Sequence, residues 1–270
     1  MAKVFSVLSW NVEHFKGSVK KRVDDVTTQI KNINPDIFAL YEVEGKEVFS
    51  SFTSIMPNYH FHITEGPQTQ EILVGAKNSF STFFTQKLEF KSGNQYLRPG
   101  ALLTVTINTQ IYSLLFLHTK SGTNPLGLGI RDDMFNRACS FRKVLGGKAK
   151  DWKTNYIFLG DLNTMGMEYP YGKSITAKTE IKKLAEIEAK KVKMRILKKD
   201  EPASWWNGSK SKIPPSNLDQ IVASDNLKFK KYSGAEVTVL GWPKESTTEK
   251  KDEWIKQYSD HGIIYFEISE

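Results

Sequence analysis

The stretch Asn155–Gly166, with the sequence NYIFLGDLNTMG, decides the fold. Its apolar run 156–159 ends at Gly160, which is followed by Asp161 and Asn163. An apolar run of this length beside a turn residue predicts a buried strand. Residues two apart in an extended chain point the same way, so Asp161 and Asn163 can enter one pocket. An Asx-type turn at the strand end explains the same two residues, and the stretch alone leaves both interpretations open.

The composition of the 270 residues predicts one globular domain, because no linker-like segment divides the chain. Lys and Arg number 38 against 30 Asp and Glu, a net charge of +8. This excess favours a polyanionic partner, although basic surfaces also serve solubility. Cys139 is the only cysteine, so an intramolecular disulfide is excluded. No apolar leader or membrane span follows Met1, and we expect a cytoplasmic monomer with no membrane partner.

Other predicted strands also end in polar residues. The run 4–10 precedes Asn11, the run 36–41 precedes Glu42, and a helix is predicted between them over 20–33. This order predicts a βαβ-like unit near the N-terminus. Further strands are predicted over 59–63, 71–76, 82–90, 101–107, 111–118, 217–223 and 262–268, and further helices over 46–56, 131–145 and 174–197.

Eight polar residues lie at or beside the ends of these strands, where an apolar core does not require them. They are Asn11, Glu42, His118, Asp161, Asn163, Asp219, Asp260 and His261. A single one, such as His118, is explained by a structural role, but unpaired buried carboxylates and imidazoles are costly. Eight together predict convergence on one edge of packed sheets. Clustered carboxylates stay ionised only around a cation, and oxygen donors favour Mg²⁺, or Mn²⁺, over Zn²⁺.

These residues stand in motifs that resemble those of the endonuclease/exonuclease/phosphatase superfamily, which includes DNase I, exonuclease III and the AP endonucleases. The matching segments, in order along the chain, are Trp10-Asn11, Tyr41-Glu42-Val43, Gly160-Asp161-Leu162-Asn163, Leu218-Asp219 and Ser259-Asp260-His261. The resemblance implies an α+β fold: a four-layer α/β/β/α sandwich of two mixed, mainly antiparallel sheets flanked by helices. It also implies a single domain over 1–270 with a Mg²⁺-dependent phosphodiesterase site.

The resemblance implies a role for each matched residue. Glu42 would bind Mg²⁺ directly, and Asn11 and Asp260 would support the ion, partly through water. Asp161 and Asn163 would orient the attacking water and a phosphate oxygen. The residue types suit this chemistry, because phosphodiester hydrolysis needs an aligned water, a proton acceptor and positive charge at the phosphorus centre.

Histidines complete the implied site. His261, held by Asp219, would act as general base or hold the phosphate, and the resemblance leaves open whether Asp161 or His261 takes the proton. His118 stands where DNase I-like members carry a second histidine. Glu71 opens a predicted strand and could pair with His118 as a second carboxylate–imidazole dyad. A solvated charge at a strand edge is the other interpretation of Glu71.

Three further features bear on the substrate. Arg98 precedes a predicted strand much as a phosphate-contacting arginine does in DNase I-like members. The segment Lys173–Lys199 holds ten Lys or Arg against three Glu, and we interpret it as an insertion that rims the site and binds backbone phosphates. Trp205 or Trp206 would stack on a base or wedge a groove. A solvated helix and two structural tryptophans explain the same residues.

Missing motifs narrow the substrate further. Residues 164–167 lack the arginine that follows the third motif in inositol polyphosphate 5-phosphatases, and Pro202–Trp206 does not supply their Pro-x-Trp-x-Asp-Arg motif. The N-terminus argues against a secreted sphingomyelinase. We therefore predict a nuclease acting on DNA, as a DNase I-like endonuclease or an AP endonuclease/exonuclease. The alternatives are a phosphoesterase for a phospholipid or other small phosphoester, and an inactive protein that binds phosphate-bearing ligands.

Overall fold

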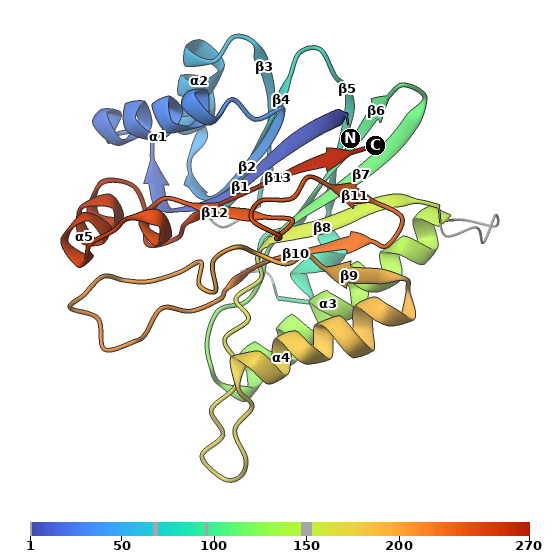
Figure 1. Ribbon diagram of the computed structural model, residues 1–270, viewed down its shortest axis with the longest axis vertical. Coiled ribbons are helices and arrows are strands. Elements are labelled where there is room, and N and C mark those ends of the chain that lie inside the picture. The colour runs from blue at the N-terminus through green and yellow to red at the C-terminus, as the bar shows by residue number, and fades with distance from the viewer. Residues whose placement is uncertain (1, 67–69, 95–96, 147–152) are drawn as a thin grey trace.

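The computed structural model describes residues 2–66, 70–94, 97–146 and 153–270, which form two sheets and the helices around them (Figure 1). One sheet has the order β11-β13-β1-β2-β4-β3, with β12 also paired to β13, and the other has the order β5-β6-β7-β8-β10-β9. The strands are β1 (Lys3–Lys16), β2 (Ile37–Glu44), β3 (Tyr59–Ile63), β4 (Gln70–Lys77), β5 (Ser81–Lys87), β6 (Gly100–Ile107), β7 (Gln110–His118), β8 (Asn155–Asp161), β9 (Met194–Ile196), β10 (Asp219–Ser224), β11 (Lys228–Phe229), β12 (Thr238–Leu240) and β13 (Ile263–Ser269). The helices are α1 (Lys20–Ile33), α2 (Lys46–Ile55), α3 (Pro125–Gly146), α4 (Ala177–Lys183) and α5 (Thr248–Gln257), with π-helical turns over Leu184–Ala189 and 3-10 turns over Leu88–Lys91 and Trp242–Lys244.

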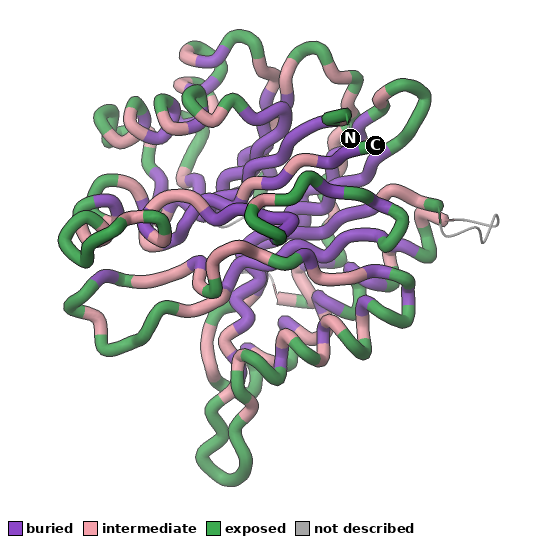
Figure 2. The backbone as a smooth tube through the Cα atoms, in the orientation of Figure 1, coloured by how far each residue is buried: buried purple, intermediate pink, exposed green. Residues whose placement is uncertain are grey.

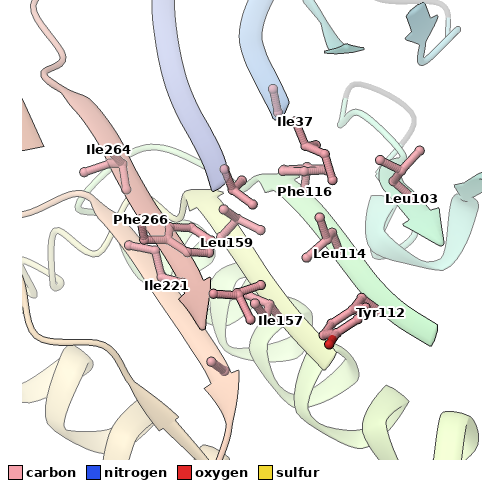
Figure 3. Packing of buried hydrophobic residues seen from close by; sticks show 14 of the residues in the cluster. Ile37, Leu103, Tyr112, Leu114, Phe116, Ile157, Leu159, Ile221, Ile264 and Phe266 are labelled. Carbon is pink, nitrogen blue, oxygen red and sulfur yellow. The ribbon is translucent and has the colours of Figure 1, made fainter. Parts of the chain in front are cut away.

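Three apolar layers hold the sandwich together. The central layer lies between the sheets, where residues such as Phe116 and Leu159 of one sheet meet Ile37 and Phe266 of the other (Figure 3). A second layer packs α1, α2 and α5 on the outer face of the first sheet, and a third packs α3 and the α4 segment on the second. Figure 2 shows the buried strands inside this shell of helices and loops. The predicted α+β, four-layer α/β/β/α fold is therefore confirmed.

The strand directions bring distant polar residues to one edge. The pairs β1–β2 and β7–β8 are parallel, and a helix connects the strands of each pair. Parallel strands end at the same edge, which gathers Asn11 and Glu42 from one pair and His118 and Asp161 from the other. Strand β10 runs antiparallel to β8, so its first residue, Asp219, lies opposite Asp161.

Several predicted boundaries were wrong. Strand β1 continues to Lys16 through an irregularity between Asn11 and Phe15, so Asn11 lies within the strand. Strand β5 ends at Lys87, where 3-10 turns begin. The helix predicted over 174–197 instead gives way to β9, because residues 194–196 pair with the apolar edge of β10. Helix α5 and the short strands β11 and β12 were missed. None of the helices described is long and apolar enough to cross a membrane.

Candidate active site

A cavity of about 540 Å³ opens at the edge where the polar residues meet. Its walls include six of the eight residues predicted to converge, namely Glu42, His118, Asp161, Asn163, Asp260 and His261. The other two, Asn11 and Asp219, hydrogen-bond directly to members of this group. The structure therefore brings all eight residues together.

Asn11 ties the two sheets together at the cavity floor. Its Nδ2 donates to Glu42 Oε1 at 3.0 Å and to Asp161 Oδ2 at 2.9 Å. Its Oδ1 accepts the Glu13 N–H at 3.0 Å. One amide thus fixes a carboxylate from β2 beside a carboxylate from β8. Glu42 has the uncommon φ of 61°, a left-handed conformation that the surrounding sheet must hold in place.

Gly160 brings Asp161 to the inner wall of the cavity. Its φ is 139°, and a Cβ there would lie 2.1 Å from the Leu117 carbonyl oxygen and 2.7 Å from the Tyr41 hydroxyl. Only glycine fits between β7 and Tyr41. The Asn163 N–H then donates to Asp161 Oδ1 at 3.1 Å, which is an Asx turn. The two interpretations of this stretch are both correct, because the turn is what aims the two side chains.

His261 and Asp219 form a buried imidazole–carboxylate pair. His261 Nδ1 lies 2.9 Å from Asp219 Oδ2, which leaves Nε2 facing Asp161 Oδ2 at 3.7 Å. The Ser259 hydroxyl accepts the His261 N–H at 3.0 Å and so fixes the loop. Burial lowers the pKa of His261, but the carboxylates of Asp219 and Asp161 outweigh burial and raise this pKa above its ordinary value. The two carboxylates therefore favour the charged form of the imidazole.

His118 behaves differently from His261. Its Nε2 lies 3.5 Å from Asp161 Oδ2 and 3.8 Å from Glu42 Oε1, and its Nδ1 has no hydrogen-bond partner within the described ranges. Burial, followed by the charges of Arg98 and His261, lowers its pKa well below the ordinary value. His118 is thus a neutral imidazole beside the two carboxylates.

The carboxylates of the site lack counter-ions of the usual kind. Across the described part of the chain, Glu42, Asp161, Asp219 and Asp260 have only histidines within ion-pair distance, and no Lys or Arg. Burial raises the pKa of Asp161 to about 6 and also raises the pKa of Asp260. One buried oxygen of Asp260 and one of Asp219 have no hydrogen-bond partner among the described residues.

This donor set fits a divalent cation. The ligand atoms of Glu42, His118 and Asp161 lie within 4.8 Å of one another, as do those of Asp161, Asp219 and His261. Buried carboxylates whose pKa values are raised by burial and by each other gain the most from a nearby positive charge. The mostly oxygen donors match the hard cations Mg²⁺ and Mn²⁺.

The predicted dyad of Glu71 and His118 is not formed. The Glu71 carboxylate accepts hydrogen bonds from the Thr64 hydroxyl at 2.5 Å and the Gly66 N–H at 3.1 Å, and it faces a separate cavity. Successive residues of a strand point to opposite faces, so the preceding residue, Gln70, faces the site instead. The prediction chose the wrong face of β4.

The two adjacent tryptophans, Trp205 and Trp206, also point to different sides of the chain. Trp205 lines the cavity, and its Nε1 donates to Asp260 Oδ2 at 2.7 Å. Trp206 instead packs against Trp242 at a centroid distance of 5.7 Å, in the layer beneath α5. The structure thus leaves Trp205 available to a substrate and places Trp206 in a structural role.

Arg98 lines the cavity, half-buried, as a phosphate-binding residue would. Its Nε donates to the Gln70 carbonyl oxygen at 2.8 Å, and its guanidinium also contacts the Gln70 side chain. Gln70 Nε2 in turn lies 3.3 Å from Glu42 Oε2. Sequence reasoning missed Gln70 and the cavity-lining residues Glu13 and His14, although Glu13 follows Asn11 at the predicted strand end.

The lysines of the Lys-rich segment 173–199 do not line the cavity; Ala177 is the residue of this segment that does. Helix α4 lies along α3 (Figure 1), and buried Glu180 pairs with Arg131 of α3 at 2.7 Å. Lys199 is half-buried beside the site, where its Nζ donates to the Asp219 carbonyl oxygen and desolvation of its ammonium group lowers its pKa to about 8.

Comparisons with solved structures identify proteins of the same fold. Truncated TDP2 from Caenorhabditis elegans is 18% identical, covers 98% of each chain and has a TM-score of 0.68. TDP2 from D. rerio, solved with a single-strand DNA product, is 18% identical with a TM-score of 0.65, covering 98% of this chain and 99% of the other. A mannosyl-6-phosphatase from Bacteroides thetaiotaomicron is 15% identical with a TM-score of 0.63, covering 98% of this chain and 100% of the other.

At these identities the solved structures establish the fold alone. A search of curated proteins gave no match. The sequence profile of the Endonuclease/Exonuclease/phosphatase family, however, matches residues 8–261, a range that includes all eight residues that meet at the cavity. The chain therefore belongs to the endonuclease/exonuclease/phosphatase family.

Proposed function

We propose that this phosphoesterase is a Mg²⁺-dependent phosphodiesterase, and specifically a nuclease acting on DNA. The observation that carries the proposal is the carboxylate cluster at the cavity, whose ion-pair partners among the described residues are histidines and not Lys or Arg. A cation held by Glu42, with support from Asn11 and Asp260, would supply positive charge to the phosphate when bound. The protein's own residues then have separable tasks.

Asp161 is the better candidate for the proton acceptor. A general base works best when its pKa lies near the working pH, and burial raises the pKa of Asp161 to about 6. His261 is already charged in this arrangement, so its Nε2–H is suited to hold a phosphate oxygen. Asp219 fixes the imidazole orientation through its 2.9 Å contact with Nδ1. The Asn163 side chain, held at the same wall, would orient the substrate phosphate.

Nucleic acid is favoured as the substrate for two reasons. The net charge of +8 attracts a polyanion, and the half-buried Arg98 supplies a cation on the cavity wall beside the carboxylates. The similarity to D. rerio TDP2, solved with a single-strand DNA product, supports this choice. The similarity to a mannosyl-6-phosphatase supports a second candidate, a phosphoesterase for a small sugar phosphate or comparable monoester.

A substrate panel separates these functions. Wild-type protein is incubated with plasmid DNA, single-stranded DNA, a duplex with an abasic site, bis(p-nitrophenyl) phosphate, a sugar phosphate and phospholipid vesicles, each with Mg²⁺, Mn²⁺ or EDTA. We expect cation-dependent cleavage of DNA that is absent from the matched Asp161→Asn protein. Turnover of the sugar phosphate or lipid without DNA cleavage would replace the nuclease assignment. A lack of turnover on every substrate would favour a binding-only protein.

A further inference from the structure

A hairpin beside the active-site cavity exposes two aromatic rings that pack on no core. Residues 167–175 form this hairpin, which projects from the body below α4 (Figure 1) and is exposed along its tip (Figure 2). Tyr171 is 89% exposed, more than any other large apolar side chain described, and Tyr169 is 41% exposed. Their rings meet edge to face at 6.1 Å, and most of the Tyr171 ring remains exposed to solvent. Exposing two rings side by side is unfavourable in water unless a partner covers them.

The base of the hairpin is held rigidly even though its tip is exposed. The fully buried Arg131 donates to the Gly166 carbonyl oxygen at 2.7 Å, and Glu180 accepts the Gly166 N–H at 2.7 Å. Gly166 has a φ of +77°, and a Cβ there would lie 2.2 Å from the Ile175 carbonyl oxygen. Glycine is thus needed to close the hairpin. The fold fixes the direction of the loop before any partner arrives, as a binding element requires.

The hairpin also adjoins the catalytic cavity. A second hollow of about 400 Å³ lies between residues 123–124 and the hairpin, and its walls include Tyr169. Thr123 and Glu168 line both this hollow and the active-site cavity. The Glu168 N–H donates to the Thr123 carbonyl oxygen at 2.7 Å, which joins the hairpin to the cavity rim. A chain-like substrate leaving the site on this side would pass over the tyrosines.

We propose that Tyr169 and Tyr171 form a stacking platform for unpaired bases of a single-stranded nucleic acid whose scissile phosphate lies in the active site. The proposal rests on the proposed nuclease function and adds a strand preference to it. Aromatic faces bind bases of any sequence, because every base has a π face, and the exposed Lys173 and Lys178 nearby can neutralise backbone phosphates. A fully paired duplex keeps its base faces stacked and gains little from the platform.

A membrane surface fits these observations less well. Interfacial binding grows with the apolar area that is buried, and this tip offers two tyrosines with hydroxyl groups rather than an extended apolar face. The hollow that joins the tip to the cavity favours an elongated, chain-like ligand over a flat membrane surface.

The test compares substitutions that keep or remove the ring. We measure Kd for a labelled single strand of about 15 nucleotides and for the matching duplex, using the inactive Asp161→Asn protein as background, by fluorescence anisotropy. Tyr171→Ser is expected to weaken single-strand binding about tenfold and duplex binding much less, since one stacked base accounts for an effect of that order. Tyr171→Phe keeps the ring and should retain the affinity. Phe83→Ser, which removes a ring that is 70% exposed on β5, is the control for loss of an exposed ring elsewhere on the surface.

Activity measurements separate this proposal from the proposed function. In the active background, Tyr171→Ser should raise KM for the single strand about tenfold and leave kcat within about twofold. An unchanged Kd for the single strand, or equal losses for single strand and duplex, would overturn the stacking platform while cleavage by wild type upholds the nuclease. Vesicle binding that depends on Tyr171, with unchanged Kd for the single strand, would assign the tip to a membrane instead. Thermal midpoints of all variants verify folding.

Discussion

Two buried carboxylates at opposite edges of the sandwich, Asp36 beside the start of β2 and Asp161 at the end of β8, lie in opposite surroundings. At the edge near the chain termini, Asp36 accepts hydrogen bonds from the Ser6 N–H and hydroxyl, each at 2.9 Å. It also pairs with Lys3 at 2.7 Å and Lys77 at 2.9 Å. Burial raises the pKa of Asp36, but these lysines and hydrogen bonds outweigh it and lower this pKa to about 2. At the other edge, the pKa of Asp161 is raised to about 6.

The different neighbours of Asp36 and Asp161 indicate what each carboxylate contributes. The fold supplies Asp36 with its positive charges, so Asp36 stabilises the native state. At the site, the part of the chain that the structure describes supplies Asp161 with an amide and two histidines but no lysine or arginine within ion-pair distance, so an external cation would stabilise the cluster. Active sites commonly sacrifice stability in this way, because the groups are placed for ligands and not for each other.

The largest expected effect comes from neutralising the site carboxylate. Asp161→Asn should lower kcat on the nucleic-acid substrate by about a thousandfold, since it removes the candidate proton acceptor. In EDTA the same change should leave the thermal midpoint unchanged or raise it, because it relieves repulsion within the cluster. Calorimetry in EDTA and steady-state kinetics measure the two effects. A clear loss of stability in EDTA would mean that Asp161 is structural, as Asp36 is.

The next effect is cation-dependent stability. Ligand that binds only the native state stabilises it, by about 2.7 kcal/mol when its concentration is a hundred times Kd. We expect Mg²⁺ or Mn²⁺ to raise the thermal midpoint of wild type and of Asp36→Asn, and to have little effect on Glu42→Gln. Midpoints are recorded across a cation titration with Ca²⁺ and K⁺ as comparisons. An identical shift of the thermal midpoint in Glu42→Gln would show that Glu42 does not bind the cation.

Asp36→Asn gives a smaller effect with a defined pH dependence. The pKa of Asp36 falls from 3.8 to about 2 on folding, so its carboxylate adds stability at every pH above its unfolded pKa and loses it as pH falls toward 2. The substitution should therefore lower the free energy of unfolding by about 2 kcal/mol at pH 7, and the deficit should close between about pH 4 and pH 2. Urea unfolding at several pH values measures the deficit. A deficit that persists unchanged at pH 2 would exclude the ionic origin.

The smallest effect tests the link between the cavity wall and the cluster. Trp205→Phe keeps a ring but removes the indole N–H that donates to Asp260 Oδ2. A hydrogen bond to a charged group contributes about 1.5–3 kcal/mol, and water can replace part of it, so we expect about a tenfold weaker apparent affinity for the cation. Cation titrations of activity measure this shift. Unchanged cation dependence would restrict Trp205 to substrate contact.

The sequence predicted which residues meet at the candidate site better than it predicted the neighbours that these residues contact. The motifs around Glu42, Asp161 and His261 lie at or beside strand ends, Asn11 lies in β1 where its pairing becomes irregular, and the directions of the strands bring all four to one edge. The prediction for Glu71 was wrong because a shift of one residue along a strand turns the side chain to the opposite face of the sheet. Strand β4 is buried on both faces, so its hydrophobic pattern does not indicate which face points toward the site.

Segments with weak patterns were beyond prediction. Residues 194–196 follow a Lys-rich helix and contain too few residues to show an alternation, yet they form β9 because the edge of β10 is there to pair with. Helix α5 was missed in a charged stretch, where Trp254 is its single buried residue. In both cases a neighbour distant in sequence supplies the stabilisation, so tertiary packing overrides local propensity.

The sequence by itself determined the apolar strand runs, the family motifs and the eight polar residues beside those runs, and the resemblance that the motifs carry implied the layered fold. Hydrophobic runs are sufficient to place strands along the chain, because a buried strand needs apolar side chains. Only the tertiary structure decided which neighbours those residues meet: Gln70 in place of Glu71, Trp205 in place of Trp206, and histidines in place of lysines around Asp161. The physical reason is that the charge state of a buried group depends on distances of a few ångströms between segments far apart in the chain.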